Sequence, residues 1–251
     1  MHFLEIRNLG KNFQGVPALQ DLSFTLEQGE VLGLIGPNGS GKSTFFNVLT
    51  HLAPADQGQI FFQGEDITQQ KTYEIARRGV ARSFQDAHPM PQITVRDNLD
   101  LAFSYRTPVS LASVFWRRKA LHNEEQIHFQ GIRELLGKVG LQNKEQVLAQ
   151  NLSYGQGKLL EILKILARDA KLILLDEPFS GLFPEMILLI TKLLKELAQQ
   201  GKTILLIEHN MELIAELSDR VIVLDAGKKI ADGKFAEIRR DALVQEAYLG
   251  K

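Results

Sequence analysis

Residues 36–43 have the spacing of a glycine-rich phosphate-binding loop, G-x-x-x-x-G-K-S. They follow the apolar run Val31–Ile35, which is typical of a buried parallel strand, and precede Thr44–Leu49, whose apolar positions indicate a helix. An ordinary glycine turn would explain the glycines, but not the complete spacing between a strand and a helix. Such a loop points successive N–H groups and a helix start at phosphate groups. The chain is therefore predicted to bind a nucleoside triphosphate.

The residue types in this loop suggest separate roles. Glycines permit positive φ and a close approach of the backbone, while Lys42 supplies positive charge and the Ser43 hydroxyl supplies a ligand for Mg²⁺. The residues expected to hold the phosphates are Gly36, Pro37, Asn38, Gly39, Ser40, Gly41, Lys42, Ser43 and Thr44.

Composition narrows the class of protein. At 251 residues, 44% hydrophobic and 24% charged, the chain is an ordinary globular protein by composition. No apolar run approaches the roughly 20 residues that span a bilayer, and the start lacks the regions of a signal peptide. The absence of cysteine excludes disulfides and thiol chemistry, and a net charge of −1 gives no reason to expect nucleic acid. We therefore expect a cytoplasmic protein that does not bind nucleic acid.

The apolar patterns divide the chain into a core and an insertion. Strand patterns predominate from Phe3 to Ile67, with the first two runs at Phe3–Leu9 and Leu22–Leu26, and predict a small antiparallel sheet beside the nucleotide core. From residue 86 to 152 the patterns become helical, which predicts an inserted helical subdomain. Its expected helices are 95–103, 110–121 and 124–139.

Strands and helices alternate again after this insertion. The expected elements are Leu172–Leu175, Pro184–Gln200, Thr203–Ile207, Met211–Leu217 and Val221–Leu224, and then a short amphipathic helix within Phe235–Lys251. Such alternation predicts a mostly parallel sheet with helices on both faces. The fold class is therefore α/β, a phosphate-loop NTPase core built from residues 1–85 and 153–251.

Two acids end one of the expected strands. The run Leu172–Leu175 is followed by Asp176 and Glu177, so both carboxylates emerge at the carboxyl end of a parallel strand, where ligands of open α/β sheets bind. Two solvated acids would fit this run if it stood alone. Together with the phosphate loop, the pair suggests that Asp176 helps to hold Mg²⁺ and that Glu177 polarises the attacking water.

The segment Leu152–Gln156, called the signature segment below, separates this chain from other phosphate-loop proteins. Ser153 and Gln156 have the spacing of a capping box, and leucines and isoleucines give the next helix its apolar face. Taken alone, the segment indicates only a well-capped helix. In its place before the acidic strand, it resembles the signature sequence of ATP-binding cassette (ABC) proteins.

This resemblance covers nearly the whole chain and implies further roles. In that family the signature of one subunit closes over ATP held by the phosphate loop of another, which suggests that Ser153, Gly155 and Gln156 contact nucleotide. Phe13 resembles the aromatic that stacks on adenine. Gln85 resembles the glutamine that senses Mg²⁺ and attacking water, and His209 resembles the histidine that contacts the γ-phosphate. Singly, Gln85 and His209 would not indicate function, but their order and spacing do.

Two positions depart from the family pattern. Phe183 stands where the family usually has Asp or Asn in the loop that crosses between subunits, so polar communication through that loop is in question. Gly157 replaces a helix-favouring polar residue, at an expected cost of about 0.5–1 kcal/mol relative to alanine. Neither position supplies a phosphate, Mg²⁺ or water contact, so ATP hydrolysis is expected to be retained.

Finer resemblance points to importers of branched-chain amino acids, urea or amides. It rests on Ala81–Gln85, the insert Tyr105–His128, the signature segment, Ile207–Met211 and the ending Ala236–Gly250. The resemblance implies ATP and Mg²⁺ as cofactors, a second cassette that is identical or different, and integral membrane permease subunits. It also implies an extracytoplasmic solute-binding protein as an indirect partner and a peripheral place on the cytoplasmic face of the membrane. Phe115 and Trp116 could contact the permease, although a buried role is equally compatible.

Three alternatives remain at this stage. A soluble cassette ATPase of translation or DNA maintenance would usually have tandem cassettes or long coiled coils, and neither is visible. A GTPase would need a guanine-reading Asn-Lys-x-Asp motif, and Asn143–Gln146 lacks the final aspartate. A regulatory module without turnover is disfavoured by Glu177.

Overall fold

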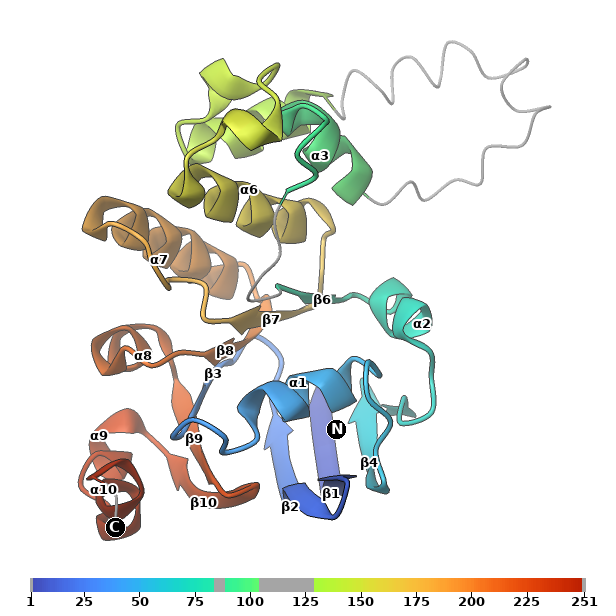
Figure 1. Ribbon diagram of the computed structural model, residues 1–251, viewed down its shortest axis with the longest axis vertical. Helices are drawn as coiled ribbons and strands as arrows, with labels where there is room; N and C mark the ends of the chain where they lie inside the picture. Colours follow the sequence, from blue (N-terminus) through green and yellow to red (C-terminus); the bar gives the residue numbers. More distant parts are fainter. Residues whose placement is uncertain (1, 84–88, 104–128, 250–251) are drawn as a thin grey trace, which may run out of the picture. The chain divides into compact units, whose positions relative to one another are not determined.

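The computed structural model describes residues 2–83, 89–103 and 129–249, which form two units (Figure 1). The core unit comprises residues 1–85, 170–180 and 190–251, and the helical unit comprises residues 86–169 and 181–189. Gln85 and the expected helix 110–121, with Phe115 and Trp116, lie outside the described residues.

The named strands all lie in the core unit, whereas helices occur in both units. In chain order they are β1 (Leu4–Phe13), β2 (Val16–Leu26), β3 (Val31–Ile35), α1 (Lys42–Leu49), β4 (Gln57–Phe62), β5 (Glu65–Asp66), α2 (Thr72–Arg77), β6 (Val80–Arg82), α3 (Val95–Ala102), η1 (Gln142–Lys144), η2 (Ala149–Asn151), α6 (Tyr154–Ala167), β7 (Leu172–Asp176), α7 (Pro184–Gln199), β8 (Thr203–Ile207), α8 (Met211–Leu217), β9 (Arg220–Asp225), β10 (Lys228–Gly233), α9 (Phe235–Ile238) and α10 (Ala242–Leu249). Residues 129–138 are also helical. No helix within the described ranges has both the length and the apolar character needed to cross a bilayer.

A six-stranded sheet forms the centre of the core unit, in the order β10-β9-β3-β8-β7-β6. All neighbours are parallel except β10, which pairs antiparallel with β9. The strands β3, β7 and β8 are buried along their whole length, as expected for parallel strands covered on both faces. The α/β fold class predicted from the sequence is confirmed.

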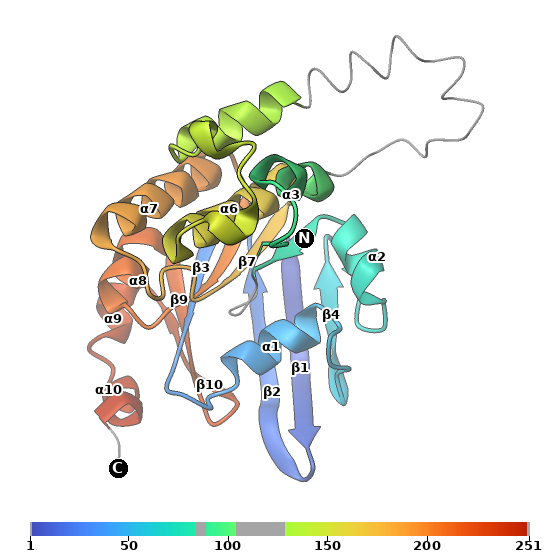
Figure 2. The ribbon, with the colours of Figure 1, turned by 45° about the horizontal axis from the view of Figure 1, so that its top comes forward.

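The predicted antiparallel sheet is also present, and its strands are longer than expected. Its order is β2-β1-β4-β5, and β1 and β2 form a hairpin whose long strands lie side by side in both ribbon views (Figures 1 and 2). Sequence patterns placed the first strand at Phe3–Leu9, whereas β1 continues to Phe13. Bulges interrupt the β1–β2 register beyond Ile6, which explains why simple alternation fails there.

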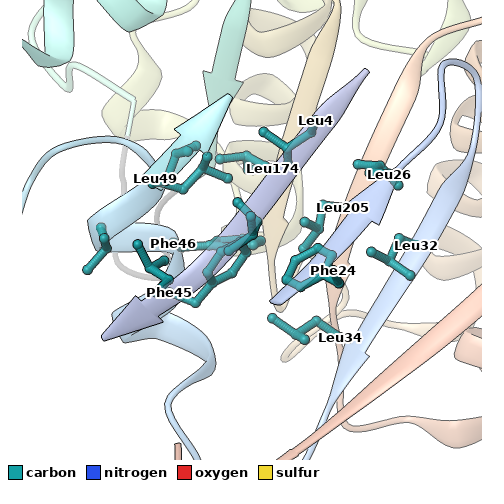
Figure 3. Packing of buried hydrophobic residues seen from close by; sticks show 14 of the residues in the cluster. Leu4, Phe24, Leu26, Leu32, Leu34, Phe45, Phe46, Leu49, Leu174 and Leu205 are labelled. Carbon is teal, nitrogen blue, oxygen red and sulfur yellow. The ribbon is translucent and has the colours of Figure 1, made fainter. Parts of the chain in front are cut away.

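The helix α1 packs between the two sheets and closes the core. Phe45 and Phe46 are fully buried, and they cluster with residues of both sheets such as Leu4, Leu34 and Leu174 (Figure 3). Each such phenylalanine contributes about 1.5–3 kcal/mol through removal of apolar surface from water. This packing fixes the helix that follows the phosphate loop.

The helix α8 covers the opposite face of the parallel sheet. A Cβ at Gly33 would come within 2.7 Å of the Ser218 hydroxyl oxygen and 3.2 Å of a methyl of Ile214. Glycine at this strand position therefore lets α8 lie close to β3. The sheet has helices on both faces, as predicted.

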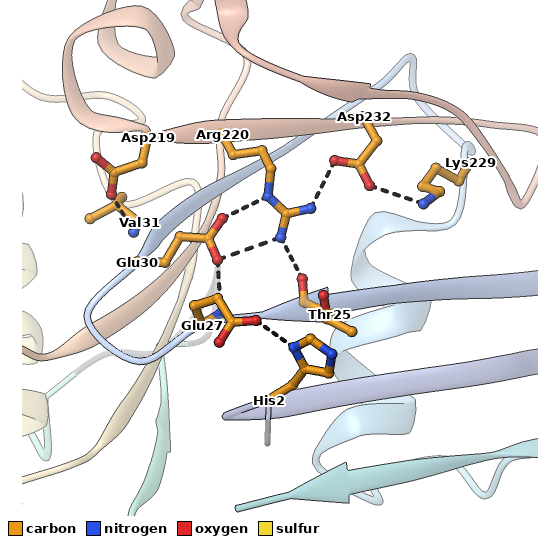
Figure 4. A network of polar contacts seen from close by, with 9 residues as sticks. All are labelled: His2, Thr25, Glu27, Glu30, Val31, Asp219, Arg220, Lys229 and Asp232. Carbon is orange, nitrogen blue, oxygen red and sulfur yellow. Dashed lines mark hydrogen bonds and ion pairs between the residues drawn. The ribbon is translucent and has the colours of Figure 1, made fainter.

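Arg220 joins the two sheets, and Figure 4 shows its partners. Its partner Glu30 precedes β3, whereas the phosphate loop follows that strand, so Arg220 lies at the opposite end of the sheet. Its Nε donates to Glu30 Oε1 at 2.7 Å, its Nη1 donates to Asp232 Oδ1 at 2.8 Å, and its Nη2 donates to the carbonyl oxygen of Thr25. Burial lowers the pKa of Arg220, but the bonded Glu30 and Asp232 carboxylates outweigh that effect and raise it. One guanidinium thus connects β2, β9, β10 and the turn before β3.

The helical unit includes more of the chain than the expected 86–152. The helix α6, with its buried leucines and isoleucines, packs against α3 and belongs to this unit, as do residues 181–189. The compact unit extends to residue 169, and the expected boundary at residue 152 stays a prediction. Asn98, which is 1% exposed, bonds the backbone of Met90 through both amide atoms and holds the start of the unit on α3.

The expected single tail helix is wrong. The tail contains two helices, α9 and α10, separated at Arg239–Asp241. Asp241 explains the break, because its Oδ1 accepts hydrogen bonds from the backbone N–H groups of Leu243 and Val244 and so caps α10.

Candidate nucleotide-binding site

The phosphate loop lies between β3 and α1, as predicted. Gly41 precedes α1 with φ of +104°, and a Cβ there would come within 2.5 Å of the carbonyl oxygen of Ala18. Only glycine fits this position, and the helix start has no side-chain cap. The loop borders a cavity of about 300 Å³ in the core unit. The cavity is lined by Ala18, Asn38, Gly39, Ser40, Gly41, Lys42, Ser43, Thr44, Glu177 and His209.

Lys42 is 6% exposed and folds back over its own loop. Its Nζ donates to the carbonyl oxygens of Gly36 at 2.8 Å and Pro37 at 2.9 Å. Burial lowers the pKa of Lys42, and the nearby carboxylates of Glu177 and Asp176 oppose that fall. Anionic phosphate oxygens are stronger acceptors for an ammonium than neutral carbonyls, so this lysine is suited to exchange its loop contacts for a phosphate.

Asp176 ends β7 in a buried position, with 4% exposure. Its Oδ2 lies 3.4 Å from Nη2 of Arg82, while its Oδ1 is buried without a hydrogen-bond partner among the described residues. Burial raises the pKa of the Asp176 carboxyl, and Arg82 opposes the rise. An unpartnered buried carboxylate oxygen fits a site for a hard cation such as Mg²⁺.

Ser43 supplies the second oxygen expected for that cation. It lies in the first turn of α1 and lines the cavity beside the phosphate loop, whereas Asp176 is not among the lining residues. Among the described residues no three His, Cys, Asp or Glu side chains gather as a metal site. The donor set therefore fits an ion that also takes oxygens from phosphate and water, as Mg²⁺ does.

Glu177 and His209 form a close pair at the cavity wall. Glu177 Oε1 lies 2.8 Å from His209 Nε2, and the two residues follow the neighbouring strands β7 and β8. Glu177 has φ of +49°, a left-handed conformation that non-glycine residues seldom adopt. Such conformations cluster at functional sites because the surrounding structure holds them there. A carboxylate beside an imidazole can orient a water molecule and receive its proton.

The sequence indicated no separate role for Arg82, which lies within the family-like run Ala81–Gln85. Its Nη1 donates to Asn47 Oδ1 at 2.8 Å, and its guanidinium lies 5.3 Å from the centre of the Phe46 ring. Arg82 therefore ties α1, which carries Ser43, to β7, which carries Asp176. A charged residue directly after the apolar residues Val80 and Ala81 was the signal that could have indicated a buried cation.

Phe13 does not line the cavity. It ends β1 with 47% exposure, and the Lys11 ammonium lies 5.3 Å from its ring centre. The hairpin reaches the phosphate loop through Ala18 of β2, which lines the cavity and whose carbonyl oxygen would lie 2.5 Å from a Cβ at Gly41. Stacking of adenine on this exposed ring stays a prediction.

The signature segment lies in the helical unit and has the predicted capping box. Ser153 Oγ accepts from the N–H of Gln156 at 3.3 Å, and Gln156 Oε1 accepts from the N–H of Ser153 at 3.1 Å. A Cβ at Gly155 would come within 2.1 Å of the Met186 sulfur. Glycine at this position therefore leaves space for the side chain of Met186, which lies three residues after Phe183. Phe183 itself is 74% exposed.

A separate hollow of about 220 Å³ lies beside this segment, within the helical unit. It is lined by Pro89, Pro91, Ala149, Gln150, Leu152, Ser153, Tyr154, Gly157 and Lys158.

Comparison with known proteins places these features in one family. Residues 19–180 match the family described as ABC transporter, and residues 228–251 match the family described as branched-chain amino acid ATP-binding cassette transporter. The chain belongs to the ABC transporter family. Cassettes of this family hydrolyse ATP, so the chain is an ATP-binding subunit with ATPase activity.

Two curated relatives match over the full length of this cassette. The "Probable branched-chain amino acid transport ATP-binding protein LivG" of Archaeoglobus fulgidus is 37% identical over 100% of this chain and 96% of its own. The lipopolysaccharide export system ATP-binding protein LptB of Escherichia coli is 32% identical over 100% of this chain and 98% of its own. The two relatives serve different transport systems.

Solved structures agree with the fold. A nucleotide-free ATP-binding cassette from an ABC transporter has a TM-score of 0.85 at 32% identity, with both chains covered in full. A dimeric cassette in a post-hydrolysis state, bound to ADP and Pi, has a TM-score of 0.77 at 25% identity and covers 92% of this chain and 98% of its own. ATP-binding subunits of this family dimerise and work with membrane permeases.

Proposed function

We propose that this cassette powers an importer of branched-chain amino acids or of a related small polar solute such as urea. The match of residues 228–251 to the branched-chain amino acid cassette family supports this most directly. The LivG relative, similar over the whole chain, supports it further. In this proposal the cassette lies at the cytoplasmic face of the membrane, bound to permease subunits, and an extracytoplasmic binding protein delivers the solute.

In the proposed site, each residue predicted from the sequence has one role. Residues 36–44 bind the phosphates, with Lys42 as the cation and Phe13 beside the adenine. Ser43 and Asp176 would hold Mg²⁺, which offsets negative charge on the phosphate oxygens when bound. Glu177 orients the attacking water, and His209 donates to the transferred phosphoryl group. Gln85 is proposed as a further contact to Mg²⁺ and water.

A second cassette completes the site in this proposal. Ser153, Gly155 and Gln156 of one subunit would face the terminal phosphate bound by its partner, which can be a second copy or a different cassette. The hydroxyl of Ser153 accepts a bond from Gln156 and still has a proton to donate to a phosphate oxygen. Hydrolysis removes that contact, so ATP binding and hydrolysis would close and open the pair.

Replacing Glu177 with Gln tests the assignment of the water-orienting residue. Hydrolysis should fall by about two to four orders of magnitude because the general base is lost, whereas ATP affinity should be unchanged because the phosphate contacts remain. ATP turnover and binding of a fluorescent ATP analogue measure the two effects, and size exclusion with ATP should show a trapped dimer. Turnover equal to that of the parent chain would remove Glu177 from this role.

The transported solute requires a test in the membrane. The tagged chain, purified from membranes of its own cells together with the subunits it binds, would be reconstituted in vesicles with ATP. Uptake of labelled leucine, valine or urea is the expected result. If no membrane protein copurifies, the soluble ATPase alternative is favoured. If ATP turnover responds to lipopolysaccharide and to none of these solutes, an export role like that of LptB is favoured.

A further inference from the structure

Glu208 is a buried carboxylate that none of the roles above uses. It follows β8 directly and is 5% exposed, although its neighbours His209 and Asn210 are exposed. Carboxylates are seldom buried to this extent unless hydrogen bonds or opposite charges compensate the loss of water. The surroundings of Glu208 supply such bonds.

Three backbone N–H groups converge on this carboxylate. The N–H of Phe179 donates to Oε1 at 3.2 Å, and the N–H groups of His209 and Asn210 donate to Oε2 at 3.0 and 3.3 Å. Burial raises the pKa of the Glu208 carboxyl, and these three donors oppose the rise. Within the described part of the chain no cation bonds this carboxylate, so the side chain serves backbone donors of two separate segments.

These donors lie just beyond the point where two strands stop pairing. The β7–β8 ladder ends at Asp176 and Ile207, and one further backbone bond joins the N–H of Glu177 to the carbonyl oxygen of Ile207. Beyond it, the chain enters a turn at Glu177 and a separate loop at His209. Glu208 replaces the missing ladder with side-chain bonds and connects the turn to the loop.

The connection sets the distance between the two residues proposed to act on water and phosphate. Phe179 lies two residues after Glu177, and His209 directly follows Glu208, so the bonded backbone carries both side chains. Their contact of 2.8 Å depends on the relative position of these two segments. Asn210 extends the same connection to α8, because its Oδ1 caps that helix.

We propose that Glu208 is a positioning residue for ATP hydrolysis, whose buried carboxylate holds the His209 loop against the turn that begins at Glu177. The proposal rests on the function proposed above for Glu177 and His209. Glu208 does not touch nucleotide in this assignment, since it does not line the cavity. It acts on hydrolysis by placing His209 beside Glu177.

Replacement of Glu208 by Gln tests this directly. The carboxamide has the same shape but offers one acceptor oxygen, and its NH₂ group would face at least one of the three N–H donors. We expect kcat to fall about 10- to 100-fold while the KM for ATP changes less than about threefold, because the phosphate loop is unchanged. Glu208→Asp retains the charge with a shorter reach and should retain an intermediate kcat. Glu212→Gln, at an exposed carboxylate on α8, is the matched control and should retain the parent kcat.

A double-variant cycle separates positioning from a general loss of stability. If Glu208 acts through His209, then in a His209→Ala chain the further change Glu208→Gln should lower kcat by less than about twofold, because the residue it places is already absent. Hydrogen exchange of the Phe179, His209 and Asn210 amides should accelerate at least about tenfold in Glu208→Gln. Exchange in α1 should be unchanged.

Two results would overturn the proposal. One is a parent-like kcat in Glu208→Gln, and the other is a full additional loss in the His209→Ala background. The result for Glu177→Gln distinguishes this failure from a failure of the proposed function. If Glu177→Gln is inactive while Glu208→Gln is fully active, only the inference about Glu208 fails. If Glu177→Gln retains parent turnover, the proposed mechanism fails as well.

Discussion

Two helices of this cassette begin beside residues expected to contact phosphate, and their first turns are completed in different ways. The helix α1 starts after Gly41 with no side-chain cap, whereas α6 starts at Ser153 with a full capping box. The first backbone N–H groups of α1 therefore have no side-chain cap, which suits a helix end that binds an anion. The start of α6 is capped by its own side chains, so the hydroxyl proton of Ser153 is what this end can donate to a ligand. The start of α1 is suited to bind phosphate by itself, and the start of α6 is suited to complete a phosphate site that another segment forms.

The largest expected effect is a loss of ATP affinity in Lys42→Ala, which changes the first residue of α1. Loss of the ammonium removes the charge that accompanies the α1 start, and two charge-assisted hydrogen bonds of about 1.5 kcal/mol each correspond to about 100-fold in ATP affinity. Titration with ATP by calorimetry measures it. The exposed Lys71→Ala is the control and should bind like the parent chain. Unchanged affinity in Lys42→Ala would contradict the role of the loop as a phosphate site.

A smaller effect is expected from Ser153→Ala. The loss of the cap should lower the free energy of unfolding by about 1 kcal/mol. Hydrolysis should fall about tenfold or more, because each lost phosphate contact is expected to cost about 1.5 kcal/mol, while ATP affinity of the single chain should be retained. Denaturant unfolding and ATP turnover measure the two effects.

Thr94→Ala is the matched control for that variant. Thr94 caps α3 with the same box, since its Oγ1 accepts from the N–H of Asp97 at 3.1 Å. Thr94→Ala should lower the free energy of unfolding by the same amount and leave ATP turnover unchanged. Equal losses of turnover in both variants would mean that Ser153 is only a cap, and the proposed contact across the dimer would be wrong.

The smallest effect is expected from Gly157→Ala. A Cβ at Gly157 would lie 3.8 Å from the nearest atom of Pro89, an ordinary contact, so alanine should stabilise α6 by about 0.5–1 kcal/mol. This corresponds to a rise in Tm of about 1–4 °C. Gly137→Ala, where a Cβ would meet open space, is the control. A loss of turnover confined to Gly157→Ala would show that the helix start needs close approach by a partner.

Sequence patterns predicted the parts of the site that are local. The phosphate loop, the acids after β7 and the capping box each occupy a few consecutive residues with a fixed physical requirement, so their spacing carried the prediction. The structure gathers Lys42, Glu177 and His209 around one cavity, as their order along the chain suggested.

The parts that sequence reasoning missed depend on distant partners. Arg82 pairs with Asp176, 94 residues away, and Glu208 bonds Phe179, 29 residues away. No short pattern records such pairs. The tail was predicted as one helix because Asp241 was not recognised as a cap, and the packing of α6 on α3 also depends on distant residues.

The left-handed backbone at Glu177 implies that fold stability and ATP turnover favour different residues at this position. A non-glycine residue held at φ of +49° costs on the order of 1 kcal/mol, so Glu177→Gly should relieve strain while removing the carboxylate. In the proposed mechanism, this strain is the stability that the fold gives up to hold a carboxylate at the cavity wall.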